Sequence, residues 1–165
     1  NPWMQESSNK IIQDGEIVSF DTDMVGPYGY CADISRAFVC GNKFNEHQKK
    51  IYLTAVEQID YNSRLIKDGV SFREFTEKAW ILPEKFYGNR YSVMLHGIGL
   101  CDEWPAIRYP TDGGERSGTF QKNMTITLES YIGEVGGNEG VKLEQQYLVG
   151  ENGLELMSHH PLEQI

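Results

Sequence analysis

Residues 16–39, EIVSFDTDMVGPYGYCADISRAFV, predict the structural unit on which the rest of the fold is built. The first part, residues 16–23, is rich in β-branched and aromatic side chains, which favour a strand. Residues 26–29 (GPYG) have the composition of a turn, and residues 30–39 return as a second strand. The stretch therefore predicts a β-hairpin.

Three aspartates lie on this predicted hairpin. Asp21 and Asp23 are two positions apart, so an extended chain would direct both side chains to the same face. Asp33 lies on the other arm, where cross-strand pairing can bring it close to them. Three acids on a solvent-exposed hairpin are an equally simple interpretation of this segment alone.

Two helices are expected after the hairpin. Asn45 and Gln48 have the spacing of a capping box, and apolar residues then recur at helical intervals until about residue 67. Ser71 and Glu74 predict the start of a second helix, which Pro83 limits.

The remaining pattern predicts strands at residues 91–95, 124–132 and 141–149, with an irregular polar segment at 101–123. A strand hairpin, two helices and then further strands is an α+β order and differs from the alternation of a doubly wound fold. Within these 165 residues we expect a single domain.

Composition excludes several classes of partner. The chain has 24 acidic and 15 basic residues and a formal net charge of -9, which disfavours binding to nucleic acid or anionic membranes. Its apolar stretches are shorter than the roughly 20 residues of a membrane span. The three cysteines lack C-x-x-C spacing and are expected to be reduced thiols of a cytoplasmic protein. The chain starts without methionine, and we interpret it as a piece of a longer protein.

Acidic residues and one histidine recur at strands or strand ends along the whole chain. His96 precedes a glycine-rich loop, and Glu129 and Glu144 each interrupt an apolar strand. Individually, His96 can be a loop histidine and each glutamate a solvent-facing strand residue. Together with the three aspartates they form a set rich in oxygen donors with one imidazole, which suits Fe(II), Mn(II), Co(II) or Zn(II). So many carboxylates can share one site only if cations offset their repulsion.

The motifs that carry these residues resemble those of the creatinase, aminopeptidase P and methionine aminopeptidase superfamily, the pita-bread enzymes. They are Gly29-Tyr30-Cys31-Ala32-Asp33-Ile34-Ser35-Arg36, His96-Gly97-Ile98-Gly99-Leu100, Thr127-Leu128-Glu129 and Val141-Lys142-Leu143-Glu144. The resemblance implies that residues 1–165 are the C-terminal portion of one pita-bread catalytic domain. An N-terminal domain and the first part of the catalytic domain would lie upstream. It further implies two divalent metal ions, bridged by Asp33 and Glu144.

The sequence departs from the peptidase pattern at three places. Peptidases have one aspartate eleven positions before the second, whereas here Asp21 and Asp23 flank that position, which makes six candidate ligands: Asp21, Asp23, Asp33, His96, Glu129 and Glu144. Asp102 replaces a histidine that helps to hold the peptide, and an ionised aspartate cannot donate the hydrogen bond that this histidine supplies. Gln145 stands where an aspartate usually follows the second glutamate.

At all three places the sequence resembles one branch of the superfamily, the dimethylsulfoniopropionate lyases of the DddP type. This branch shares the motifs Phe20-Asp21-Thr22-Asp23 and His96-Gly97-Ile98-Gly99-Leu100-Cys101-Asp102-Glu103-Trp104-Pro105. The resemblance implies a homodimeric lyase with iron in the site, Asp102 as the catalytic carboxylate and Tyr91 as a substrate-binding residue. The expected reaction is elimination of dimethyl sulfide and acrylate from a small zwitterionic substrate.

Three alternatives stay open on the sequence alone. The same scaffold supports an Xaa-Pro dipeptidase or aminopeptidase, against which the missing histidine argues. A creatinase-like carbon–nitrogen hydrolase is the second, although that branch lacks metal ligands that are present here. A non-catalytic pita-bread binding module is the third, and the intact ligand set argues against it.

Overall fold

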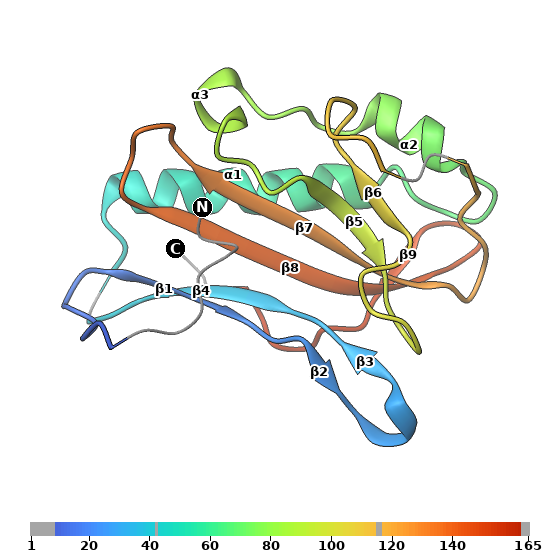
Figure 1. The fold of residues 1–165 in the computed structure, drawn as a ribbon, viewed down its shortest axis with the longest axis horizontal. Helices are drawn as coiled ribbons and strands as arrows, with labels where there is room; N and C mark the ends of the chain where they lie inside the picture. The colour runs from blue at the N-terminus through green and yellow to red at the C-terminus, as the bar shows by residue number, and fades with distance from the viewer. Residues whose placement is uncertain (1–8, 42, 115–116, 163–165) are drawn as a thin grey trace.

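The computed structural model describes residues 9–41, 43–114 and 117–162. Its centre is a five-stranded antiparallel sheet in the order β6-β5-β7-β8-β9 (Figure 1). The strands are β5 (Val93–Gly97), β6 (Ala106–Arg108), β7 (Thr125–Gly133), β8 (Gly140–Val149) and β9 (Leu154–Leu156). The long strands β7 and β8 are buried over almost their whole length and form the middle of the fold.

Helix α1 (Glu46–Ser63) packs across one face of β7 and β8. Its apolar residues Ile51, Tyr52, Ala55 and Ile59 are all buried in that contact layer. The predicted capping box is present, because Asn45 accepts from the backbone N–H of Gln48 and the Gln48 side chain accepts from that of Asn45. Two short helices follow, α2 (Phe72–Lys78) and α3 (Glu84–Tyr87).

The predicted hairpin forms a twisted ribbon in two parts. Strand β1 (Ile17–Asp21) pairs with β4 (Ser35–Val39), and β2 (Met24–Val25) pairs with β3 (Cys31–Ala32). Figure 1 shows this ribbon and α1 on opposite sides of β7 and β8, and β4 packs against β8. The site described below lies between the ribbon and the sheet.

Arg36 joins the ribbon to the sheet. Its buried guanidinium donates from Nη1 to the carbonyl oxygens of Ser35 (2.8 Å) and Glu144 (2.7 Å), and from Nη2 to Gln145 Oε1 (2.6 Å). A planar donor group with several acceptors holds two elements in one geometry. Arg36 therefore sets the position of the ribbon relative to β8.

The structure confirms the α+β class and corrects several element boundaries. Strand β1 ends at Asp21, so Asp23 lies in the connection to β2 and the argument that both aspartates share one strand face was wrong. The first helix ends at Ser63, earlier than expected. Strand β6, within the segment predicted to be irregular, and the equally short α3 and β9 were not predicted, because three or four residues carry too little periodicity.

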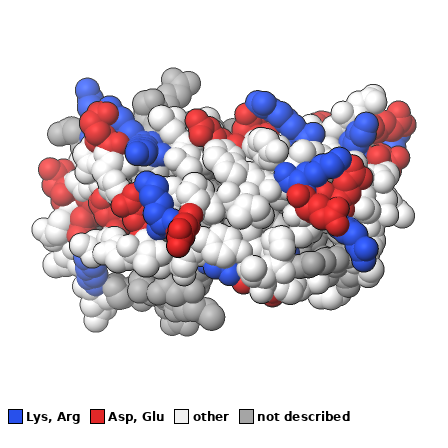
Figure 2. All heavy atoms as spheres, turned by 90° about the horizontal axis from the view of Figure 1, so that it is seen from above, with Lys and Arg blue, Asp and Glu red and all other residues white. Residues whose placement is uncertain are grey.

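The surface agrees with the composition. Figure 2 shows basic and acidic side chains side by side on the face it displays, without a broad basic region there. Among the described residues no helix has the length and apolar character needed to cross a membrane. All three cysteines are free thiols.

Candidate metal centre

The ribbon and three sheet strands bring the six candidate ligands to one place. Asp21 ends β1, Asp23 follows it, and Asp33 lies between β3 and β4. The other three are His96 on β5, Glu129 on β7 and Glu144 on β8; Glu129 and Glu144 are direct partners in the β7–β8 register. Because residues far apart in sequence converge here, only the tertiary fold creates the cluster.

His96 is the centre of this cluster. Its Nε2 lies 3.3 Å from Glu144 Oε1, 3.4 Å from Glu129 Oε1 and 3.7 Å from Asp33 Oδ2. All four side chains are buried, with His96 and Glu144 at 0% exposure. The alternatives of a loop histidine and of solvent-facing glutamates are therefore wrong.

Several buried atoms of the cluster have no hydrogen-bond partner. Within the described residues these are Asp33 Oδ1, His96 Nε2, Glu129 Oε1 and Glu144 Oε1. Burying such atoms unpaired is costly, and a divalent cation would satisfy all of them together. Carboxylate oxygens and imidazole nitrogen are suitable donors for Fe, Mn, Co or Zn, so the residues present fit a metal centre.

The pKa values of two residues of the cluster are raised, as expected where carboxylates are crowded together. Burial and the neighbouring carboxylates of Glu144, Asp21 and Asp23 raise the pKa of Asp33 to about 9. Burial lowers the pKa of His96, but its interactions with Glu144 and Glu129 outweigh burial and raise that pKa to about 10. Both shifts favour the protonated form of the residue, which lowers the net negative charge among the crowded carboxylates.

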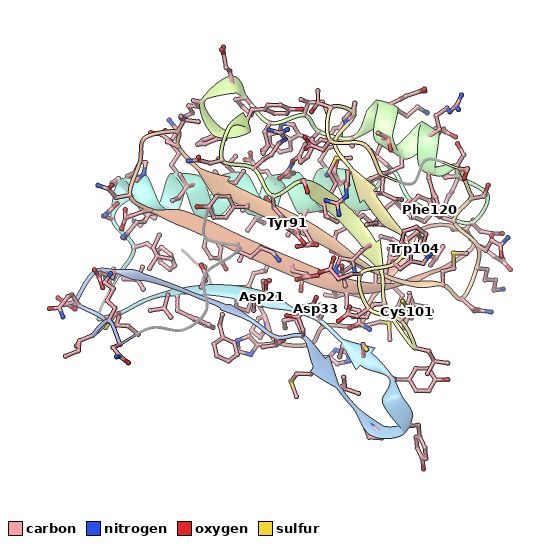
Figure 3. All side chains as sticks on the ribbon, viewed as in Figure 1. Asp21, Asp33, Tyr91, Cys101, Trp104 and Phe120 are labelled. Atoms are coloured by element: carbon pink, nitrogen blue, oxygen red, sulfur yellow. The ribbon has the colours of Figure 1, made fainter. Side chains whose placement is uncertain are left out.

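Asp21 and Asp23 are exposed, unlike the other four candidate ligands. Figure 3 shows Asp21 on the ribbon, next to Asp33. One Asp21 oxygen lies within 4.8 Å of ligand atoms of Asp33 and Glu144, and one Asp23 oxygen within the same distance of Asp33 and Glu103. Each aspartate could therefore share an ion with Asp33, Asp21 from the end of the strand and Asp23 from the loop that follows it.

Asp102 lies on the loop that follows β5. Its carboxylate comes within 4.8 Å of ligand atoms of Asp33 and His96, and its Oδ1 accepts from the backbone N–H of Glu103 at 3.0 Å. Gly97 allows this loop to fold back, because a Cβ there would meet Trp104 O at 2.4 Å. The loop thus holds Asp102 at the open side of the cluster.

Tyr91 borders the same space. Its ring centroid lies 5.3 Å from Lys142 Nζ, and burial, then the charges of Glu129 and Glu103, raises the pKa of its hydroxyl. Trp104 is 61% exposed and lines a different space, a cavity of about 410 Å³ to which none of the six candidate ligands contributes. Tyr91, which the resemblance implied as a substrate-binding residue, therefore lies beside the cluster. Trp104 lines the neighbouring cavity instead.

Three residues of the site were missed from the sequence. Glu103 has φ +61°, a conformation that a glutamate seldom adopts, and its Oε1 lies 4.0 Å from His96 Nε2. The Ser35 hydroxyl contacts carboxylate oxygens of Asp21 and Glu144. Lys142 is buried among the acidic side chains. The sequence indicated its role only by placing a charged residue in an apolar strand, two positions before Glu144.

The profile of Metallopeptidase family M24 matches residues 1–151. The chain belongs to metallopeptidase family M24. Its solved relatives in fold include a prolidase from Pyrococcus horikoshii (TM-score 0.79, 28% identity, 96% of this chain and 44% of that one). Another is an Xaa-Pro dipeptidase from Bacillus anthracis (TM-score 0.75, 29% identity, 96% of this chain and 43% of that one). This confirms the expected C-terminal part of a pita-bread domain.

One relative of this M24 chain is a dimethylsulfoniopropionate lyase DddP of Roseovarius nubinhibens, 39% identical over 99% of the chain. A second, from Roseobacter denitrificans, is also 39% identical over 99% of the chain. An uncharacterized peptidase of Staphylococcus aureus is 29% identical over 90% of it. The chain spans 37% of the length of each of the two lyases. Membership of M24 implies an enzyme with divalent metals.

Proposed function

We propose that the protein of which residues 1–165 form part of one catalytic domain is a dinuclear metal-dependent carbon–sulfur lyase. Its substrate would be dimethylsulfoniopropionate and its products dimethyl sulfide and acrylate. The observation that carries this proposal is the carboxylate of Asp102 at the open side of the cluster. The sequence has four histidines. Among the described residues, only His96 belongs to a group of acidic and histidine side chains whose ligand atoms lie within 4.8 Å of one another. The relatives that share 39% identity over nearly the whole chain support the same activity.

The candidate ligands would be Asp21, Asp23, Asp33, His96, Glu129 and Glu144. Two divalent ions held there would bind the substrate carboxylate and make the adjacent Cα–H more acidic. We favour iron, with Mn, Co and Zn as alternatives, and a homodimeric full-length enzyme.

Asp102 is proposed as the general base. Its ionised carboxylate takes the proton from Cα, the electron pair forms the Cα–Cβ double bond, and the C–S bond breaks with its electrons on sulfur. Dimethyl sulfide leaves as a neutral molecule and acrylate remains. Tyr91 is proposed to bind the substrate, because an aromatic face attracts a sulfonium as it attracts other ligand cations.

The test supplies the full-length, iron-loaded protein with dimethylsulfoniopropionate and measures dimethyl sulfide in the headspace. The wild type is expected to release the gas, and Asp102→Asn to be slower by about 10²- to 10⁴-fold with its metal content unchanged. Cys101→Ala, a change at the exposed neighbouring position, is the matched control. No gas from the wild type, or equal rates from wild type and Asp102→Asn, contradicts the mechanism.

A second candidate function is Xaa-Pro dipeptide hydrolysis, which the fold of the solved prolidases favours. Peptide hydrolysis on this scaffold needs a hydrogen-bond donor where the chain has Asp102, and an ionised carboxylate donates none. Release of free proline from Xaa-Pro dipeptides by the same iron-loaded protein, without dimethyl sulfide, would replace the lyase by this hydrolase.

A further inference from the structure

Lys142 is a buried cation that contacts three of the candidate ligands. It lies on β8 two residues before Glu144, so both side chains leave the strand on the same face. Its side chain is only 6% exposed, and its Nζ lies 2.5 Å from Glu129 Oε2, 3.2 Å from Glu144 Oε2 and 3.3 Å from Asp21 Oδ2. A lysine buried this deeply is rare unless it has such partners.

The contacts of Lys142 divide the oxygens of the two glutamates into two groups. The Oε2 atoms of Glu129 and Glu144 face the ammonium group. The Oε1 atoms have no hydrogen-bond partner among the described residues and lie 3.4 and 3.3 Å from His96 Nε2. Each glutamate therefore has one oxygen held by Lys142 and one directed to the place where a metal ion would lie.

Lys142 also offsets part of the negative charge of the candidate ligands. Asp21, Asp23, Asp33, Glu129 and Glu144 are five carboxylates, and two divalent ions would leave them with one uncompensated negative charge. The ammonium of Lys142, in contact with Glu129, Glu144 and Asp21, supplies a positive charge that offsets it. An uncompensated buried charge is strongly unfavourable, so the metal-loaded site is more stable with Lys142 than without it.

We propose that Lys142 is a positioning residue of the metal centre: its ammonium group holds Oε2 of Glu129, so that this glutamate offers Oε1 alone to the metal ions, and it orients the neighbouring carboxylate of Glu144. This rests on the proposed function only in that a metal pair is assumed to occupy the cluster. Without Lys142, Glu129 can turn its second oxygen inward, which changes the coordination number, and Glu144 loses a contact that orients its carboxylate. Partners that orient metal ligands typically contribute 10- to 100-fold in metal affinity.

The experiment titrates Co(II) into the metal-free, full-length protein and records both the binding curve and the visible d–d bands, which report the coordination of the ion. Lys142→Met, similar in length but uncharged, is expected to bind Co(II) at least about tenfold more weakly and with shifted bands. Lys142→Arg, which keeps the charge and the donors, is expected to restore most of the affinity. Lys122→Met, which removes a lysine paired with Glu151 on the surface, is the matched control and should behave as the wild type.

Wild-type affinity and wild-type bands in Lys142→Met would overturn the proposal, even if its melting temperature fell, because lysine would then only fill space. Failure of Lys142→Arg to recover binding would contradict it as well. If Lys142→Met does not fold, Lys142→Gln is the second neutral variant and carries the same expectation. A wild type that binds Co(II) but releases no dimethyl sulfide contradicts the proposed function and leaves this test decisive; a wild type that binds no Co(II) overturns both.

Discussion

Ser35 shows at the scale of one residue how a side chain outside the ligand set can control it. Its buried hydroxyl lies between two candidate ligands, Asp21 and Glu144, and is 3.0 Å from Glu144 Oε2. With a single proton it donates to one carboxylate at a time. Ser35 and Lys142 thus both contact Glu144 Oε2, and each of them contacts one of the two oxygens of Asp21.

Ser35→Ala is therefore expected to weaken metal binding by the full-length protein about tenfold, because Asp21 and Glu144 lose an orienting partner. Titration with Co(II) or Mn(II) measures the affinity. Ser63→Ala, which removes an exposed hydroxyl near the end of α1, should leave the affinity unchanged. If the two variants bind metal equally well, Ser35 has no role in positioning the ligands.

At the scale of elements, the site depends on how closely the 98–105 loop packs against β5. Gly97 ends that strand, its N–H donates to Pro105 O at 2.9 Å, and there is no room for a side chain beside Trp104 O. The strand carries His96 and the loop carries Asp102, so this contact sets the distance between metal site and proposed base.

Gly97→Ala places a Cβ 2.4 Å from Trp104 O and 2.8 Å from Pro105 Cδ, so the loop has to move. We expect a loss of about 1–3 kcal/mol in the free energy of unfolding and slower dimethyl sulfide release, because Asp102 moves with the loop. Denaturant unfolding and the headspace assay measure the two effects. Gly26→Ala, whose Cβ would meet its nearest neighbour at 3.2 Å, is a milder control; similar losses in both variants would contradict the specific role of Gly97.

At the scale of the whole molecule, the cluster couples stability to metal and to pH. In the metal-free protein the pKa of Asp33 is raised from 3.8 to about 9 and that of His96 from 6.5 to about 10. Groups with a raised folded-state pKa contribute stability that is complete below their unfolded pKa and is lost as pH rises through the folded value. Both groups therefore destabilise the metal-free protein as the pH rises.

The melting temperature of the chelator-treated, full-length protein is accordingly expected to fall between about pH 5 and pH 9, as Asp33 ionises and His96 loses its proton among the other carboxylates. Metal loading should raise the melting temperature and flatten this pH dependence, because bound cations pair with the ionised carboxylates. Thermal melts across this range with and without metal test the expectation. Equal melting temperatures at pH 6 and pH 9 in the metal-free protein would refute it.

The sequence predicted the larger elements well and the small ones poorly. Local signals were sufficient for α1, where Asn45 and Gln48 form the capping box, and for β7 and β8, whose apolar runs are long. Strand β1 was predicted to end two residues too late, because nothing local in Phe20-Asp21-Thr22-Asp23 marks the point where pairing with β4 ends. Pairing is a property of two segments, so one segment cannot show its limits.

By itself the sequence determined the chemical kind of the site: five carboxylates and one imidazole at strands or strand ends, in motifs of an M24 enzyme, with Asp102 in place of a histidine. Only the tertiary structure decided which atoms of these residues face one another. The β7–β8 register sets Glu129 opposite Glu144, and the ribbon on β8 brings Asp21 and Asp33 to them. The packing of remote segments also makes Lys142 part of the site, because its partners Asp21 and Glu129 lie on other strands. Residue type is encoded locally, whereas distance and burial arise when remote segments pack together.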